Sequence, residues 1–135
     1  MEMSVQLRSI PDTEAAVGWA GDHTIVVDRP PGKAGGRGLG FNGGQLLAIA
    51  IGGCMCNDLR YVAAEMGIRI AAISVDVSVT FSGEPLLATA ASVAVDVVPE
   101  DPDADVAALV ERAARTSTVS NSVSRGLPVE VRRVA

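Results

Sequence analysis

Aromatic residues are scarce in this chain of 135 residues, which has one Trp, one Tyr and two Phe. Because 48% of the residues are still hydrophobic, the core has to be built mainly from Val, Ala, Ile and Leu. A chain this apolar should fold, and its length fits one domain, 1–135. A small aliphatic core gives little stability, so we expect the chain to bury further surface as a homodimer.

Basic residues are also few: 11 Lys and Arg stand against 16 Asp and Glu, and the net charge is −5. An acidic chain without aromatic stacking platforms is poorly suited to nucleic acid, so we expect no such partner. The longest apolar run, residues 46–53, is much shorter than the ~20 residues that span a bilayer. We therefore expect no membrane partner. The first residues read as a strand and not as a signal peptide, which favours a cytoplasmic location.

Metal ligands and nucleotide motifs are almost absent. The chain has one histidine, His23, and two cysteines, Cys54 and Cys56. This set supports neither a disulfide framework nor a structural zinc site. No dinucleotide-binding or phosphate-loop motif is present, so we expect no cofactor and no metal. A serine nucleophile would have only His23 as a base, and the sequence has no nucleophile elbow, which argues against a Ser–His enzyme.

Alternating apolar and polar residues predict strands at both ends and in the middle of the chain. The predicted strands are a first one with Met3, Val5 and Leu7, then 14–20 and 23–28 around a Gly21-Asp22 turn, 73–81 and 87–97 around a turn at 82–85, and a last short one with Val129, Val131 and Val134. Between the third and fourth strands lies the stretch 30–44, which holds seven of the 14 glycines. We interpret it as a long flexible loop.

Two helices separate the strands. The first is predicted over 45–66 with Gly67 as its C-cap, and the second runs from a cap at Asp101 or Asp103 to about Arg115. The apolar face of the second helix would be Val106, Leu109, Val110 and Ala113. Residues 116–124 are rich in hydroxyls and suit turn and capping chemistry. The order βββ–α–ββ–α–β predicts an α+β fold with antiparallel sheets.

Gly52 and Gly53 lie in the middle of the first predicted helix. Two glycines there cost about 2 kcal/mol of helix stability relative to two alanines. Either another backbone approaches the helix closely at this point, or the helix breaks there.

Cys54 lies about ten residues into this helix, and it is either a reactive thiol or a small inert core residue. Residues two apart on a helix point about 200° apart, so Cys54 and Cys56 should face opposite sides and form no disulfide. Asp58 shares the face of Cys54, and a carboxylate there opposes formation of the thiolate. An activating cation must come from elsewhere. Arg29, Arg37 or a residue of a partner subunit could supply it, although Arg37 could equally be an ordinary loop residue.

At this point the sequence resembles the OsmC/Ohr family. The stretch Phe-Asn-Gly-Gly-Gln-Leu-Leu-Ala-Ile-Ala-Ile-Gly-Gly-Cys at 41–54 is similar to the helix start that leads to that family's peroxidatic cysteine. Val-Ser-Asn-Ser at 119–122 is similar to the end of its Cys-Pro-x-Ser-Asn-Ser segment. The resemblance implies an OsmC-like fold: an intertwined homodimer with two long central helices and sites at the subunit interface. It makes Cys54 the thiol that attacks an organic hydroperoxide.

The sequence departs from the family pattern at three places. Ser117 stands where the family has its second cysteine, with Thr118 in place of the proline, and Gly44 stands where a glutamate holds the catalytic arginine. The third departure is that residues 14–28, where that arginine is expected, contain none. Gly-Gly-Cys at 52–54, followed by Asp58, looks more like the OsmC-like branch than the dedicated hydroperoxide enzymes.

Three hypotheses follow for the function. The first is a thiol-dependent hydroperoxide reductase, active in oxidative-stress defence, that uses Cys54 alone and is regenerated by an external thiol, with Asp58 and Ser117 lining the site. The second is a non-enzymatic dimer that binds a small apolar ligand at the subunit interface. The third is a structural or interaction dimer with inert thiols.

Overall fold

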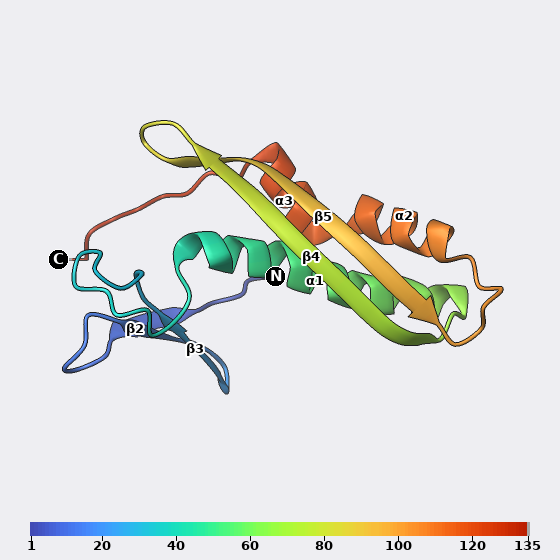
Figure 1. The fold of residues 1–135 in the computed structure, drawn as a ribbon, viewed down its shortest axis with the longest axis horizontal. Helices are drawn as coiled ribbons and strands as arrows, with labels where there is room; N and C mark the ends of the chain where they lie inside the picture. Colours follow the sequence, from blue (N-terminus) through green and yellow to red (C-terminus); the bar gives the residue numbers. More distant parts are fainter. Residues whose placement is uncertain (135) are drawn as a thin grey trace. The chain divides into compact units, whose positions relative to one another are not determined.

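The computed structural model describes residues 1–134, and the chain divides into two compact units, Met1–Leu47 and a second that begins at Ala48. Figure 1 shows the elements in chain order. They are β1 (Gln6–Ser9), β2 (Ala16–Ala20), β3 (His23–Val27), α1 (Gly43–Met66), β4 (Ile70–Ser82), β5 (Leu87–Pro99), α2 (Val106–Thr116) and α3 (Thr118–Arg125). Both sheets are antiparallel, as predicted: β1-β2-β3 in the first unit and β4-β5 in the second.

The first unit is built on the β2–β3 hairpin. Gly21 has a φ of +59° in the turn, a backbone conformation that glycine adopts without steric cost. Ala20 pairs with His23 across this turn, and β1 pairs with the other edge of β2. The predicted hairpin is therefore confirmed, and His23 lies exposed at the start of β3.

The glycine-rich stretch after β3 forms no helix or strand before α1, as predicted, but a buried carboxylate anchors it. Asp28 accepts backbone N–H groups from Arg29 at 2.8 Å and from Arg37 and Leu39 at 3.0 Å each. The hydrogen bond from Leu39 lowers the pKa of Asp28 most; those from Arg37 and Arg29 and the charge of Arg29 act in the same direction, while burial opposes them. Phe41 then pairs with β3, since its N–H donates to the Val26 carbonyl at 3.0 Å.

Helix α1 begins with a reciprocal cap. The side chain of Asn42 accepts the N–H of Gln45 at 2.9 Å, and the side chain of Gln45 accepts the N–H of Asn42 at 3.0 Å. The helix ends at Met66, before Gly67 with φ +69°, as predicted. By length and composition alone, α1 is long and apolar enough to cross a membrane, with a mean hydropathy of 1.3 over its most apolar window. Four of its buried residues, however, pack into the core of the second unit: Met55, Leu59, Val62 and Ala63.

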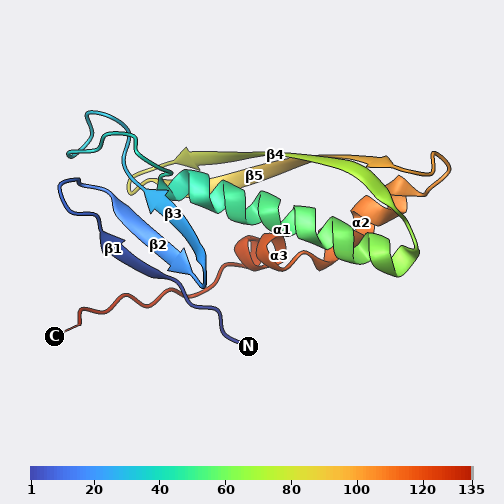
Figure 2. The ribbon, with the colours of Figure 1, turned by 90° about the horizontal axis from the view of Figure 1, so that it is seen from below.

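The second unit places α1 and α2 on one face of the long β4–β5 hairpin, and Figure 2 shows α1 running along that hairpin. Each strand has 13 residues, and together they confirm the predicted strands at 73–81 and 87–97. The core combines side chains of α1, β5 and α2. Its buried members are Met55, Leu59, Val62, Ala63, Val97, Leu109 and Ala113. The predicted apolar face of the second helix is therefore confirmed.

Close packing of α1 against a neighbouring strand, and not a break in the helix, explains the glycine at position 52. A Cβ on Gly52 would lie 2.9 Å from Cγ2 of Val77 on β4, which is closer than real Cβ contacts come. The neighbour is thus a strand side chain, where we expected backbone. A Cβ on Gly53 would meet nothing within 4 Å. The helix is continuous through both residues.

The predicted cap of the second helix is wrong by a few residues. Asp105 caps α2, because its side chain accepts the N–H of Ala108 at 3.0 Å. Asp101 instead accepts the N–H of Asp103 at 2.9 Å and holds the turn before the helix. Three aspartates in five residues compete for the cap, and backbone geometry decides among them.

The C-terminal part of the predicted order is also wrong. Residues expected to form a turn form the short helix α3, which Gly126 ends with φ +76°. Within residues 1–134, α1 has 24 residues and α2 has 11 before the extended Ser117, so the two long central helices expected of the homodimer stay a prediction. The last predicted strand is not formed either. Val129, Val131 and Val134 are exposed, and no described strand pairs with them.

Candidate functional site

The candidate site is built around Cys54, which lies half-buried in the middle of α1. One helical turn later, Asp58 presents its carboxylate to the thiol. The Sγ of Cys54 donates to Oδ2 of Asp58 over 3.3 Å. The i, i+4 spacing therefore brings the two side chains together on one face, as the sequence predicted.

Ser117 completes the arrangement from a distant part of the chain. It is fully buried in the extended joint between α2 and α3, and its Oγ donates to the Sγ of Cys54 over 3.7 Å. The thiol thus lies between a hydrogen-bond acceptor on its own helix and a donor 63 residues away. The position that the resemblance assigns to a second cysteine is in contact with Cys54.

Asn121 fixes the joint that carries Ser117. Its side-chain amide donates to the carbonyl of Ser117 at 2.6 Å and to that of Arg115 at 3.2 Å. Its backbone N–H also donates to the Ser117 carbonyl, at 3.1 Å. These bonds hold the extended residue between two helices, so the hydroxyl is placed by the surrounding backbone and not by a flexible turn.

Cys56 faces a different environment. Both cysteines are free, and Cys56 lines a shallow apolar groove of about 350 Å³ between α1 and β4. The groove is lined by Ala48, Ile49, Gly52, Gly53, Cys56, Val75 and Val77. The prediction that the two thiols point away from each other and form no disulfide is confirmed.

Asp58 also borders a cleft of about 340 Å³ between α1 and α2. Its lining residues are Asp58, Tyr61, Val62, Glu65, Arg112, Arg115 and Thr116. Both arginines of this cleft are engaged: Arg112 pairs with Glu65 at 2.9 Å, and Arg115 pairs with Glu111 at 3.2 Å. In the described part of the second unit, no cation forms a hydrogen bond with Cys54 or Asp58.

The two arginines proposed as activating cations belong to the first unit. The guanidinium of Arg29 contacts Asp28 at 3.3 Å and the carbonyl of Glu14. Arg37 uses its backbone N–H to hold the Asp28 carboxylate. Their role beside Cys54 stays a prediction. Asp28 was not predicted to have a structural role, although an aspartate between a strand and a glycine-rich loop suits an acceptor for several backbone N–H groups.

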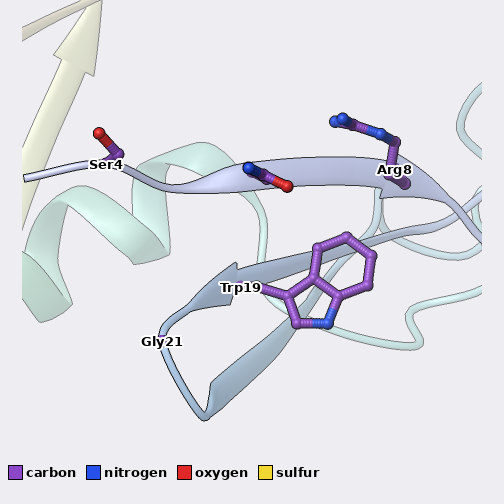
Figure 3. A pocket seen from close by; sticks show the side chains of 5 residues that line it. Ser4, Arg8, Trp19 and Gly21 are labelled. Atoms are coloured by element: carbon purple, nitrogen blue, oxygen red, sulfur yellow. The ribbon is translucent and has the colours of Figure 1, made fainter.

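A third hollow, of about 480 Å³, lies in the first unit. Figure 3 shows Arg8 of β1 and Trp19 of β2 on neighbouring strands, with Ser4 before β1 and Gly21 in the turn after β2 also lining the hollow. The β1–β2 register pairs Gln6 with Trp19, which puts Gln6, Arg8 and Trp19 on one sheet face. Among residues 1–134, no three His, Cys, Asp or Glu side chains cluster in a way that could hold a metal ion.

The fold and the site define a class of protein. It is an α+β chain with a thiol on its long helix and a hydroxyl at the joint between two later helices. The model of the OsmC-like protein family matches residues 35–132, most of the chain. The chain therefore belongs to the OsmC-like family, as the resemblance indicated. Comparison with curated proteins gives no match.

Solved structures show the same fold at low sequence identity. An OsmC-like protein from Mycoplasma pneumoniae has a TM-score of 0.76 at 13% identity, covering 92% of this chain and 88% of its own. An organic hydroperoxide resistance protein OsmC from Legionella pneumophila has 0.64 at 21%, covering 91% and 89%. The organic hydroperoxide resistance protein OhrB of Bacillus subtilis has 0.59 at 22%, covering 91% and 90%.

Proposed function

We propose that this protein is a thiol-dependent organic hydroperoxide reductase that uses Cys54 as its single peroxidatic thiol. The observation that carries the proposal is the surroundings of Cys54. The thiol is partly accessible, hydrogen-bonded to Asp58, and in contact with Ser117 at the place where a resolving cysteine would stand. A merely structural cysteine would have apolar neighbours, yet Cys54 lies outside the buried apolar cluster of the second unit.

The proposed cycle needs only one protein thiol. The sulfur attacks the terminal oxygen of the hydroperoxide, and the O–O bond breaks to give an alcohol and Cys54 sulfenic acid. An external thiol condenses with the sulfenic acid, releasing water and forming a mixed disulfide. A second external thiol then attacks this disulfide, which restores Cys54 and releases the oxidised reductant as a disulfide.

Two findings support this reading without fixing the substrate. The chain belongs to the OsmC-like family, and two of its structural neighbours are named organic hydroperoxide resistance proteins. In the proposal the working form is a homodimer, and Arg29, Arg37 or a residue of the partner subunit supplies the cation near the sulfur during attack. A cytoplasmic location stays a prediction.

The test is hydroperoxide turnover by wild type and two matched cysteine variants. Cumene hydroperoxide consumption is followed with dithiothreitol and with a monothiol as reductants. We expect Cys54→Ser to abolish turnover and Cys56→Ser to retain most of it, because only Cys54 contacts Asp58 and Ser117. Equal losses in the two variants would contradict the assignment of a single nucleophile.

The second candidate function, non-enzymatic binding of a small apolar ligand, is favoured by the groove beside Cys56. Its lining residues are apolar or small, and Ile49 at its rim is exposed. This candidate predicts that the fluorescent probe 1-anilinonaphthalene-8-sulfonate binds wild type and Cys54→Ser equally. Ile49→Asp should lose that binding, because it places a charge at the rim of an apolar site. Inert thiols together with no probe binding would leave the third hypothesis, a structural or interaction dimer.

A further inference from the structure

Asp58 is the charged group nearest to the reacting sulfur in the second unit, and a carboxylate is an unexpected neighbour for a thiol that must react. A negative charge 3.3 Å from the sulfur opposes a standing thiolate. The same geometry, however, lets the carboxylate accept the proton at the moment of attack. We infer that Asp58 is the proton acceptor for Cys54 and passes that proton to the leaving alkoxide. This inference rests on the proposed peroxidase function.

The proposed step balances without a further reactant. The Cys54 sulfur forms a bond to the terminal oxygen of R–O–O–H while the O–O bond breaks. The sulfur is oxidised by two electrons to the sulfenic acid, and the peroxide is reduced by the same two. The thiol proton moves to Oδ2 of Asp58 and then to the departing RO oxygen, which leaves as the alcohol. Ser117 donates to the sulfur, so it can hold the sulfur in place but cannot take the proton while it donates.

The surroundings of Asp58 suit a group that takes and returns a proton. It is half-buried, and its side chain also borders the cleft between α1 and α2, which gives a second route for the proton to water. The ionisable groups that face it are Cys54, Tyr61 and Glu65 on its own helix and Arg112 and Arg115 on α2. The arginines are paired with Glu65 and Glu111, so neither forms a hydrogen bond or salt bridge with the Asp58 carboxylate.

The experiment compares two reactions of the same sulfur in Asp58→Asn. Single-turnover oxidation by cumene hydroperoxide is read by dimedone trapping of the sulfenic acid, and alkylation by iodoacetamide is read by mass spectrometry. Alkylation depends on the thiolate, and its leaving group, iodide, needs no proton. The alkoxide that leaves during oxidation does need one. We expect Asp58→Asn to slow oxidation by about 100-fold at pH 7. The same variant should be alkylated faster than wild type, because a like charge has been removed.

The pH profile separates a proton carrier from a merely structural residue. In wild type, the oxidation rate should vary little between pH 6 and 8. In Asp58→Asn, the rate should rise about tenfold per pH unit as thiolate forms, because only the ionised sulfur then reacts. Asp58→Glu should recover part of the rate, because it restores a carboxylate. Glu65→Gln removes another carboxylate of the same cleft that does not contact the sulfur, and should oxidise at the wild-type rate.

The outcomes separate this inference from the proposed function. If wild type is oxidised and Asp58→Asn is oxidised as fast or faster, Asp58 is not the proton acceptor and the hydroperoxide function stands. If wild type itself is not oxidised by the hydroperoxide, the function fails and the inference with it. If Asp58→Asn loses oxidation and alkylation in parallel, access to the sulfur or the folding of the protein has changed, and Asp58→Glu then decides. An Asp58→Glu variant that is alkylated like wild type but recovers no oxidation would overturn the inference.

Discussion

A single hydroxyl at position 117 decides how Cys54 can be recycled. A sulfur in that place could close a disulfide with Cys54, because the Ser117 oxygen is already 3.7 Å from the Cys54 sulfur and a disulfide requires about 2.05 Å. With an oxygen there, the sulfenic acid has no internal thiol partner at this position. The residue at position 117 therefore decides whether Cys54 is recycled by an internal thiol or by an external one.

Ser117→Cys should restore an internal resolving thiol. After one equivalent of cumene hydroperoxide, we expect an intramolecular disulfide between positions 54 and 117, seen by mass spectrometry without reductant as a loss of two hydrogen atoms. The double variant Cys54→Ser/Ser117→Cys is the control and should show no such loss. A disulfide to Cys56 instead would contradict the described geometry, in which Cys56 lines a different groove.

Asp28 supports the loop of the first unit through its charge. Its pKa is lowered, so the carboxylate stabilises the fold at pH values above the unfolded value, about 3.9, and this contribution is lost as the pH falls through the lower folded pKa. We expect Asp28→Asn to lower the thermal midpoint at pH 7, because an amide cannot accept all three N–H groups without presenting donors to them. The variant should also lose part of the wild-type dependence of stability on pH below about 4. An unchanged midpoint at pH 7 would show that the loop does not depend on this residue.

The residues of the site differ in how far the sequence could predict them. The contact of Asp58 with Cys54 follows from local helix geometry, so spacing alone predicted it. Ser117 contacts Cys54 from 63 residues away, and only the family resemblance pointed to it. Asp28 was missed, because its role depends on a loop whose path the sequence pattern does not define. The role of Arg29 and Arg37 as cations beside Cys54 stays a prediction, because it also depends on the path of that loop.

At the scale of elements, the two glycines of α1 provide a matched pair. Gly53→Ala should stabilise the protein by about 1 kcal/mol, because alanine is the better helix former and a Cβ there meets nothing within 4 Å. Gly52→Ala places its Cβ 2.9 Å from Val77, and overpacking of this kind costs about 1–3 kcal/mol. We therefore expect Gly52→Ala to be less stable than wild type, as measured by urea unfolding. Equal stabilisation by both substitutions would show that α1 does not pack this closely on β4.

Elements whose signals are local were predicted well, and those that depend on distant partners were not. The β4–β5 strands and α1 follow from alternation and from glycine at the helix end. The last predicted strand failed because alternating valines form a strand only beside a hydrogen-bonding edge. Helix α3 was missed because its Ser, Thr and Asn residues are weak helix formers that favour turns in isolation.

At the scale of the whole molecule, the balance of buried and exposed apolar residues favours self-association. Among residues 1–134, nine hydrophobic residues are buried, whereas twice as many large ones are exposed. Four of the exposed ones follow α3: Leu127, Val129, Val131 and Val134. Burying such residues against a second copy would add the stability that a small aliphatic core lacks.

We therefore expect a dimer at micromolar concentration by light scattering. Truncation after Gly126 should shift the equilibrium toward monomer, because it removes the exposed apolar residues that follow α3. A wild-type monomer at these concentrations would contradict both the core argument and the dimer expected from the family resemblance.

The most direct test of the account is whether hydroperoxide reacts with Cys54 itself. Alkylation of Cys54 is measured by mass spectrometry across pH, with and without prior treatment with cumene hydroperoxide, and Cys56 serves as the internal control. The account predicts that the hydroperoxide blocks alkylation of Cys54 and leaves Cys56 alkylated, and that an external thiol restores the reaction at Cys54. Alkylation of Cys54 that is unaffected by hydroperoxide would contradict it and would make the thiol structural.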